Sequence, residues 1–216
     1  MNRVSLAIGI GALAAALPSA ASAAVFTYTS APVVFADDAE TATPITVAGL
    51  TGTVTAISVT LNGFYHTFPS DMVLGLQNIT TGQGLVFLSE AGGSADVSGL
   101  TLTFSAASTT LASETLLTSG SYGVSNYGGY SFTAGDLGTS FTAFNGFNPN
   151  AVWNLLSLDA AAIDTGGLTG GWTLSITTSA GAVPEPGTWA MLIGGFGVMG
   201  GAMRRRAKTT TAVTFA

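Results

Sequence analysis

The chain has 216 residues, no cysteine and a formal net charge of −6, a size that suits one domain of ordinary length. The lack of cysteine excludes a disulfide framework and a thiolate metal site. All lysines and arginines lie near the two ends, so residues 24–203 contain eleven acidic residues, no basic residue and a formal charge of −11. A segment without cations cannot make the phosphate contacts that dominate nucleic-acid affinity, which excludes nucleic acid as a partner. Its carboxylates must be solvated, hydrogen-bonded or bound to a cation such as Ca²⁺.

Residues 1–23 have the pattern of a secretory signal peptide. Arg3 precedes an apolar stretch from Val4 to Leu17, and Pro18 separates that stretch from the small residues Ala21-Ser22-Ala23. This order of basic, apolar and small residues predicts export with cleavage after Ala23. A buried N-terminal helix is the alternative, and it would leave both the proline break and the cleavage pattern unexplained.

Residues 44–180 are expected to form strands. Apolar and hydroxyl residues alternate at Ile57–Leu61 and Leu100–Phe104, which places the apolar side chains on one face of each strand. Clusters of turn-forming residues separate further short apolar runs, at Met72–Leu76, Leu85–Leu88, Trp153–Leu158 and Trp172–Thr177. No long segment shows a helical period. The sequence therefore predicts an all-β fold, an antiparallel β-sandwich at 44–180 that follows an initial strand and loop at 24–43.

The C-terminal part combines a proline motif, an apolar run and a basic cluster. A linker at 181–187 holds Pro184-Glu185-Pro186, and a helix cannot continue through its prolines. The next segment, 188–203, is expected to be a transmembrane helix; its fifteen residues from Trp189 to Met203 would span about 23 Å, which implies a thin or tilted span. The tail 204–216 starts with Arg204, Arg205 and Arg206 and is expected to stay in the cytoplasm.

This order of parts resembles the PEP-CTERM sorting signal, in the variant in which tryptophan and alanine follow the proline motif. The matching residues are Pro184, Glu185, Pro186, Trp189, Ala190 and Met191, followed by the glycine-rich apolar run and the arginines. The resemblance implies a Gram-negative bacterium, a transient stay in the inner membrane, and processing near the motif by an exosortase-type membrane protease. The product would then reach the cell surface or extracellular matrix. An ordinary C-terminal anchor is the alternative, and the tail from Lys208 to Ala216 is longer than is usual for such signals.

The predicted sandwich also resembles the P-domain of proprotein convertases. The matching stretches are a strand that leads into His66-Thr67-Phe68 and Asp71, the approach to Trp153, and the segment from Asp159 to the Trp172 strand. The resemblance implies a jelly roll of the galactose-binding-like type. Asn154 and the segment between Phe104 and Phe144 depart from the pattern. We expect no subtilisin-like protease domain before the sandwich, so the family's role beside a protease is not carried over.

The candidate catalytic and metal-binding residues are few. His66 is the single histidine, and no Gly-x-Ser-x-Gly elbow accompanies it, so we expect no catalytic triad and no enzyme. Asp71, Asp159 and Asp164 follow or precede predicted strands, where aspartate usually accepts backbone hydrogen bonds in turns. The alternative is that they hold Ca²⁺ together with nearby carbonyl groups.

The segment 105–150 is rich in Gly, Ser, Tyr, Phe and Asn and has Tyr122, Tyr127 and Tyr130 at its centre. It is either a recognition loop that presents aromatic rings or a loop folded over its own core. We therefore expect a non-catalytic exported protein at the cell surface or in the matrix, associated with exopolysaccharide or biofilm. The alternatives are a carbohydrate-binding module that uses the three tyrosines, with or without Ca²⁺, and a hydrolase that depends on His66.

Overall fold

The computed structural model describes residues 23–135, 137–179 and 186–206. It divides into two compact units, one of residues 22–181 and one that joins residues 1–21 to residues 182–216. The predicted signal peptide, apart from Ala23, lies outside the described residues, as do Pro184 and Glu185.

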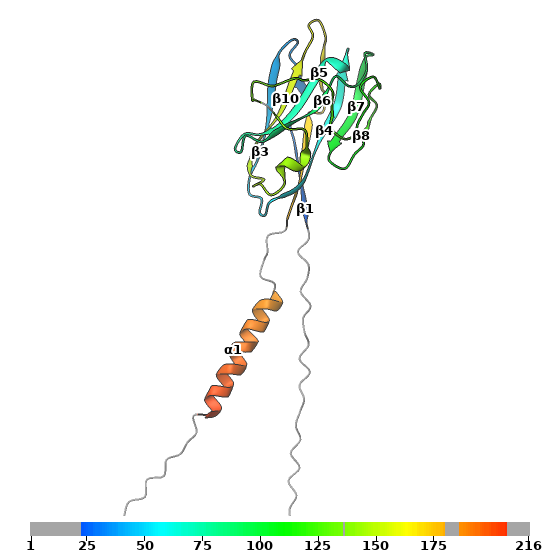
Figure 1. Ribbon diagram of the computed structural model, residues 1–216. Coiled ribbons are helices and arrows are strands. Elements are labelled where there is room, and N and C mark those ends of the chain that lie inside the picture. Colours follow the sequence, from blue (N-terminus) through cyan, green and yellow to red (C-terminus); the bar gives the residue numbers. More distant parts are fainter. Residues whose placement is uncertain (1–22, 136, 180–185, 207–216) are drawn as a thin grey trace, which may run out of the picture. The chain divides into compact units, whose positions relative to one another are not determined.

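The first unit is a two-sheet β-sandwich, as the sequence predicted (Figure 1). The larger sheet has seven strands and is centred on β4. One edge of β4 pairs first with β12 and then with β11, and these two strands pair with β1 and β2. The other edge of β4 pairs with β7, and β8 lies beside β7. The smaller sheet has five strands, in the order β3-β10-β5-β6-β9. Neighbouring strands are antiparallel, except for the short parallel pairs β6–β9 and β7–β8. The strands of the larger sheet are β1 (Ala24–Thr29), β2 (Val33–Val34), β4 (Val54–His66), β7 (Val97–Ser105), β8 (Gly120–Tyr122), β11 (Gly166–Leu168) and β12 (Trp172–Thr178). Those of the smaller sheet are β3 (Glu40–Val47), β5 (Met72–Asn78), β6 (Gly84–Ser89), β9 (Ser125–Asn126) and β10 (Ala151–Asp159).

The core lies between the two sheets and is built by the alternation seen in the sequence. Val59 and Leu61 of β4 point inward and are fully buried, as is Trp153 of β10. The Trp153 ring packs edge-on against Phe144, with 5.1 Å between ring centroids, and its Nε1 donates to the Pro149 carbonyl at 3.0 Å. The six apolar runs picked out in the sequence all lie within strands of the structure.

The outer face of the larger sheet carries an array of hydroxyl groups, which we call the hydroxyl face. The strand register places two rows of residues side by side across β1, β12, β4 and β7: Thr29, Thr173, Thr60 and Thr103 in one row, and Thr27, Ser175, Ser58 and Ser105 in the next. Side chains in the first row bond to one another, with 2.8 Å between the Oγ1 atoms of Thr29 and Thr173 and 2.9 Å between those of Thr60 and Thr103. This face is polar and uncharged, and the threonines of its first row bond to one another in pairs.

The segment 105–150 folds over the sandwich rather than standing clear of it. It contains the 3₁₀ turn η2 (Phe141–Phe144), whose two phenylalanines are buried in the main core with Leu111 and Leu117. Phe132 and Leu137 cover the outer face of the smaller sheet, where they pack against Val73, Val86 and Leu156. Of the two interpretations of this segment, its apolar part fits the loop that packs on its own core.

The second unit contains one described helix, α1 (Pro186–Arg206), which begins at a proline as helices often do. It confirms a helix over 188–203 but corrects the transmembrane assignment: within the described residues, no helix is both long and apolar enough to cross a membrane. The reason lies in composition, because five glycines interrupt the apolar side chains and arginines end the helix.

Candidate functional site

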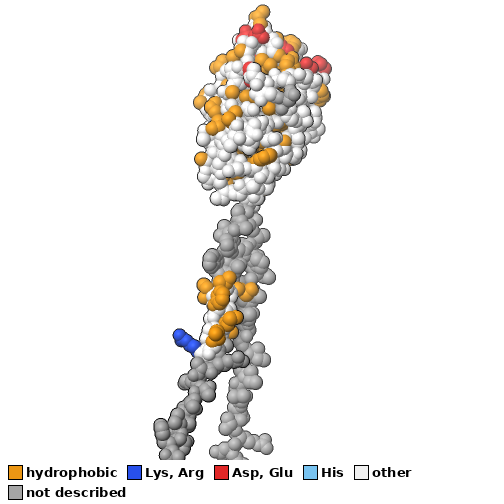
Figure 2. All heavy atoms as spheres, turned by 60° about the vertical axis from the view of Figure 1, so that its left-hand side comes forward, with side chains coloured by type: hydrophobic (Ala, Val, Ile, Leu, Met, Phe, Trp, Pro, Cys, Tyr) orange, Lys and Arg blue, Asp and Glu red, His pale blue; other side chains and the backbone are white. Residues whose placement is uncertain are grey.

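All nine acidic residues that the structure describes lie at one end of the sandwich, which we call the acidic end. It consists of the loops 35–39, 67–71, 90–96 and 160–165, the segment 112–117 and the adjoining strand ends. The nine are Asp37, Asp38, Glu40, Asp71, Glu90, Asp96, Glu114, Asp159 and Asp164. Figure 2 shows these red side chains gathered in the upper part of the sandwich, with none on the rest of the visible face. The opposite end, where Ala24 pairs with Thr178, has no acidic residue among those described.

A buried pair formed by His66 and Asp159 anchors the acidic end. His66 ends β4 and Asp159 ends β10, and the exposed fractions of their side chains are 0% and 1%. The His66 Nε2 atom lies 3.1 Å from Asp159 Oδ2, while His66 Nδ1 accepts the backbone N–H of Phe68 at 3.0 Å. Because Nδ1 accepts, the neutral ring carries its proton on Nε2 and donates it to Asp159. Gly166 lies against this ring, and a Cβ atom there would collide with it.

Asp159 is only half satisfied, because its Oδ1 atom is buried and has no hydrogen-bond partner among the described residues. Asp71, the residue just before β5, lies next to it: the Asp71 backbone carbonyl accepts the Ala160 N–H at 3.0 Å. Burial raises the pKa of Asp71, and the negative charges of Asp164 and Asp159 raise this pKa further. The structure thus gathers three carboxylates without a lysine or arginine to offset them.

Asp71, Asp159 and Asp164 are the residues that the sequence suggested as Ca²⁺ ligands, and they do lie within electrostatic range of one another. Asp164 is engaged with its own loop, because its Oδ1 accepts the Thr67 hydroxyl at 2.7 Å. The described residues contain no group of three or more His, Cys, Asp or Glu side chains arranged to hold a metal ion. A Ca²⁺ site here stays a prediction.

A hollow at the acidic end brings together two of the three tyrosines that the sequence suggested for ligand binding. It measures about 410 Å³ and is lined by Ser70, Asp71, Glu90, Ser113, Glu114, Tyr127 and Tyr130. Tyr127 is 48% exposed and Tyr130 is 36% exposed. The Tyr127 hydroxyl donates to the Leu111 carbonyl at 2.7 Å, which fixes the ring while leaving much of it open to solvent. We call this feature the tyrosine hollow.

Tyr122, the third of these residues, is not part of the tyrosine hollow. Its ring packs beside Phe104, with 5.9 Å between centroids, and its hydroxyl donates to the Thr118 carbonyl at 2.7 Å. Sequence reasoning missed Glu90 and Glu114, because they lie in loops far apart along the chain. Glu90 directly follows β6 and has a left-handed φ of 47°. A glutamate just after a predicted strand, with one residue between it and Gly92-Gly93, was the local signal available.

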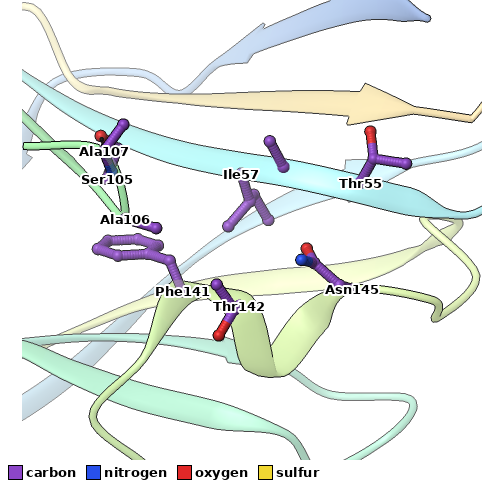
Figure 3. Close-up of a pocket in the computed structure, with 9 residues that line it drawn as sticks. Thr55, Ile57, Ser105, Ala106, Ala107, Phe141, Thr142 and Asn145 are labelled. Carbon is purple, nitrogen blue, oxygen red and sulfur yellow. Dashed lines mark hydrogen bonds between the residues drawn. The ribbon is translucent and has the colours of Figure 1, made fainter.

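The other hollows offer less chemistry. One of about 100 Å³ lies between β4, the 105–107 segment and η2, and is lined mainly by apolar groups such as Ile57, Ala106 and Phe141 (Figure 3). No titratable side chain lines it. A second, of about 210 Å³, lies over Tyr65, His66 and Asp96, but the His66 ring beneath it is already bonded at both nitrogens.

Comparison with known families identifies the C-terminal segment. Residues 182–206 match the model of the PEP-CTERM protein-sorting motif. No curated protein matches the chain. The motif marks the chain as an exported protein directed to an exosortase, a membrane protease, through a membrane-associated sorting intermediate that is then released outside the cell.

Proposed function

We propose that the protein is a non-catalytic component of the cell surface or extracellular matrix of a Gram-negative bacterium, and that it associates there with exopolysaccharide. The observation that supports this most is the sorting motif on a sandwich whose residues 24–179 carry no lysine or arginine. Such a surface has no affinity for nucleic acid or for acidic polymers, and it stays soluble beside them. The exported product suits a hydrated extracellular environment.

The non-catalytic role is supported by the state of His66. A general base in a nucleophilic triad needs one ring nitrogen to accept from the nucleophile's hydroxyl and the other to donate to an acid. In this chain the accepting nitrogen of His66 is occupied by the Phe68 backbone N–H, and the ring is buried. Its donation to Asp159 gives a bond that holds two strand ends together.

The proposal extends to the type of sandwich. We infer a jelly roll of the P-domain type, and the support is local: the His66 turn and the Trp172 strand lie in the larger sheet, and His66 bonds to Asp159 at the end of β10 in the smaller sheet. The short parallel pairs β6–β9 and β7–β8 lie in and beside the segment that showed no match to that family.

Cell fractionation tests the proposed function. We expect the processed protein in the extracellular polysaccharide fraction, and we expect enzymatic digestion of that polysaccharide to release it. A variant with Pro184, Glu185 and Pro186 all replaced by alanine should remain unprocessed in the membrane fraction. Finding the unaltered protein in the cytoplasm, or free in the medium whether or not polysaccharide is present, would contradict the proposal.

A carbohydrate-binding module is the second candidate, and the tyrosine hollow favours it. Tyrosine rings give rigid, amphipathic contact area on which a sugar ring can stack, and carboxylates accept hydrogen bonds from sugar hydroxyl groups. Binding to matrix polysaccharide should be lost in the Tyr127→Ala/Tyr130→Ala variant and retained in Tyr122→Phe, because Tyr122 lies outside the hollow. Equal loss in both variants would remove this hollow as the site.

A further inference from the structure

We propose that the tyrosine hollow binds a protonated amino sugar, a pyranose unit with a free ammonium group, within a polysaccharide. This inference rests on the proposed association with polysaccharide and adds the chemical class of the sugar. Its starting point is the combination, in one hollow of about 410 Å³, of two exposed tyrosine rings with carboxylates from three separate segments of the chain.

The carboxylates of Glu90 and Glu114 in the hollow differ from those of Glu40 and Asp37, which have donors within the acidic end. Glu40 accepts the Thr133 N–H and hydroxyl, each at 2.8 Å, and Asp37 accepts the Ile163 N–H at 3.0 Å. Within the described part of the chain, no donor is hydrogen-bonded to the carboxylates of Glu90 or Glu114. These two groups are therefore available to a ligand.

The negative potential behind the hollow faces no lysine or arginine, and His66 is the single neighbouring group that lowers the pKa of Asp71. Asp71 lines the hollow, and beside it Asp159 keeps one buried oxygen, Oδ1, without a hydrogen-bond donor among the described residues. No lysine or arginine occurs between residues 23 and 179. A ligand with an ammonium group would bring this wall a positive charge together with three hydrogen-bond donors.

The two tyrosine rings suit the sugar ring of the ligand. Tyr127 is held by its hydroxyl bond to Leu111, so its ring is ordered before a ligand arrives and binding costs little side-chain entropy. Tyrosine faces attract both the C–H face of a sugar ring and an adjacent ammonium group. A simple inorganic cation would contact the carboxylates and leave the two tyrosine rings without a partner. An amino sugar would contact the carboxylates with its ammonium group and the rings with its C–H face.

Calorimetric titration of the protein purified from producing cells tests the inference with two matched ligands. These are a hexamer of glucosamine and the N-acetylated hexamer of the same length, at a pH at which the amine is protonated. We expect the glucosamine hexamer to bind at least about tenfold more tightly, because each charge-assisted hydrogen bond is stronger than a neutral one. The Glu90→Gln/Glu114→Gln variant should lose this difference. The control, Asp38→Asn/Asp96→Asn, removes the same amount of charge from the acidic end outside the hollow. This control should keep the difference in affinity between the two hexamers.

The other outcomes separate this inference from the proposed function. Equal binding of both hexamers, or a preference that survives Glu90→Gln/Glu114→Gln, would overturn the amino-sugar assignment and leave the association with polysaccharide standing. Spermidine bound as tightly as the glucosamine hexamer would show a charge site without sugar recognition, which also overturns it. If neither hexamer nor the native matrix polysaccharide binds, the inference and the proposed function fail together.

Discussion

The hydroxyl face and the acidic end are both polar, but their polar side chains differ in whether they have hydrogen-bond partners. On the hydroxyl face, Thr60 and Thr103 bond to each other across neighbouring strands, and no charge is present. At the acidic end, Asp159 has a buried oxygen without a partner, and Glu90 and Glu114 stand in an open hollow. Hydroxyl groups that already bond to each other gain few hydrogen bonds from a ligand. Carboxylates without a hydrogen-bond partner gain more. This difference favours the acidic end over the hydroxyl face as the surface that binds a ligand.

The largest expected effect is on the stability of the whole sandwich, which carries both the hydroxyl face and the acidic end. Trp153→Ala would leave a large cavity between the sheets, since the side chain is fully buried and packs on Phe144. We expect a loss of about 3–5 kcal/mol in the free energy of unfolding. Urea denaturation checks it, and the hydroxyl face and the hollow should unfold in one transition because they share this core. Two separate transitions would show that the regions are independent.

A smaller change acts on the acidic end alone. His66→Ala leaves the buried Asp159 carboxylate without its donor, so we expect a loss of about 1–3 kcal/mol in unfolding free energy. Asp159→Asn keeps an oxygen that can accept from His66 Nε2, so it should cost less than His66→Ala. Thermal denaturation of both variants tests this order. An Asp159→Asn variant less stable than His66→Ala would contradict the hydrogen-bond arrangement.

The pH dependence of stability provides a third test, again specific to the acidic end. The folded-state pKa of Asp71 is raised above its ordinary value of 3.8, so the folded protein binds this proton more tightly than the unfolded chain does. Stability contributed by Asp71 is therefore present at low pH and is lost as the pH rises from about 3.8 through the raised pKa. Asp71→Asn should be more stable than the unaltered protein at neutral pH, and this difference should shrink as the solution becomes more acidic. An Asp71→Asn variant less stable than the unaltered protein at neutral pH would show that the folded protein stabilises the ionised Asp71 carboxylate, which contradicts the prediction.

The smallest effects are expected on the hydroxyl face. Thr60→Val and Thr103→Val replace one hydroxyl group each with a methyl group in half-buried positions of β4 and β7. Removing both partners of a hydrogen bond is nearly neutral, so the double variant should lie within about 0.5 kcal/mol of the unaltered protein. Polysaccharide binding should not change. A clear loss of binding in the double variant would move recognition from the acidic end to this face.

Sequence reasoning found the strands because their apolar positions alternate with a period of two, as at Val59 and Leu61, and this alternation directly reports burial. It found the sorting motif because that signal is contiguous. It overestimated α1 as a membrane span, because an uncharged run was read as apolar although glycines such as Gly194 and Gly195 contribute almost no apolar surface.

The candidate site was only partly predictable. Tyr127 and Tyr130 were suggested by the composition of their loop, and the structure places both in one hollow. Tyr122 is also a tyrosine of this segment, but its ring packs against Phe104 and lies outside the hollow. The contributions of Glu90 and Glu114 depend on which loops meet at one end of the sandwich, and strand order is a long-range property that local patterns do not contain.

One measurement tests directly whether the acidic end recognises polysaccharide and the hydroxyl face does not. It is NMR chemical-shift mapping of the processed protein during titration with its native matrix polysaccharide. We expect the largest backbone shifts around Asp71, Glu90, Glu114, Tyr127 and Tyr130, and almost none along β1, β12 and the hydroxyl residues of β4 and β7. Shifts concentrated on Thr60, Thr103 and Thr173 with an unchanged acidic end would contradict the account.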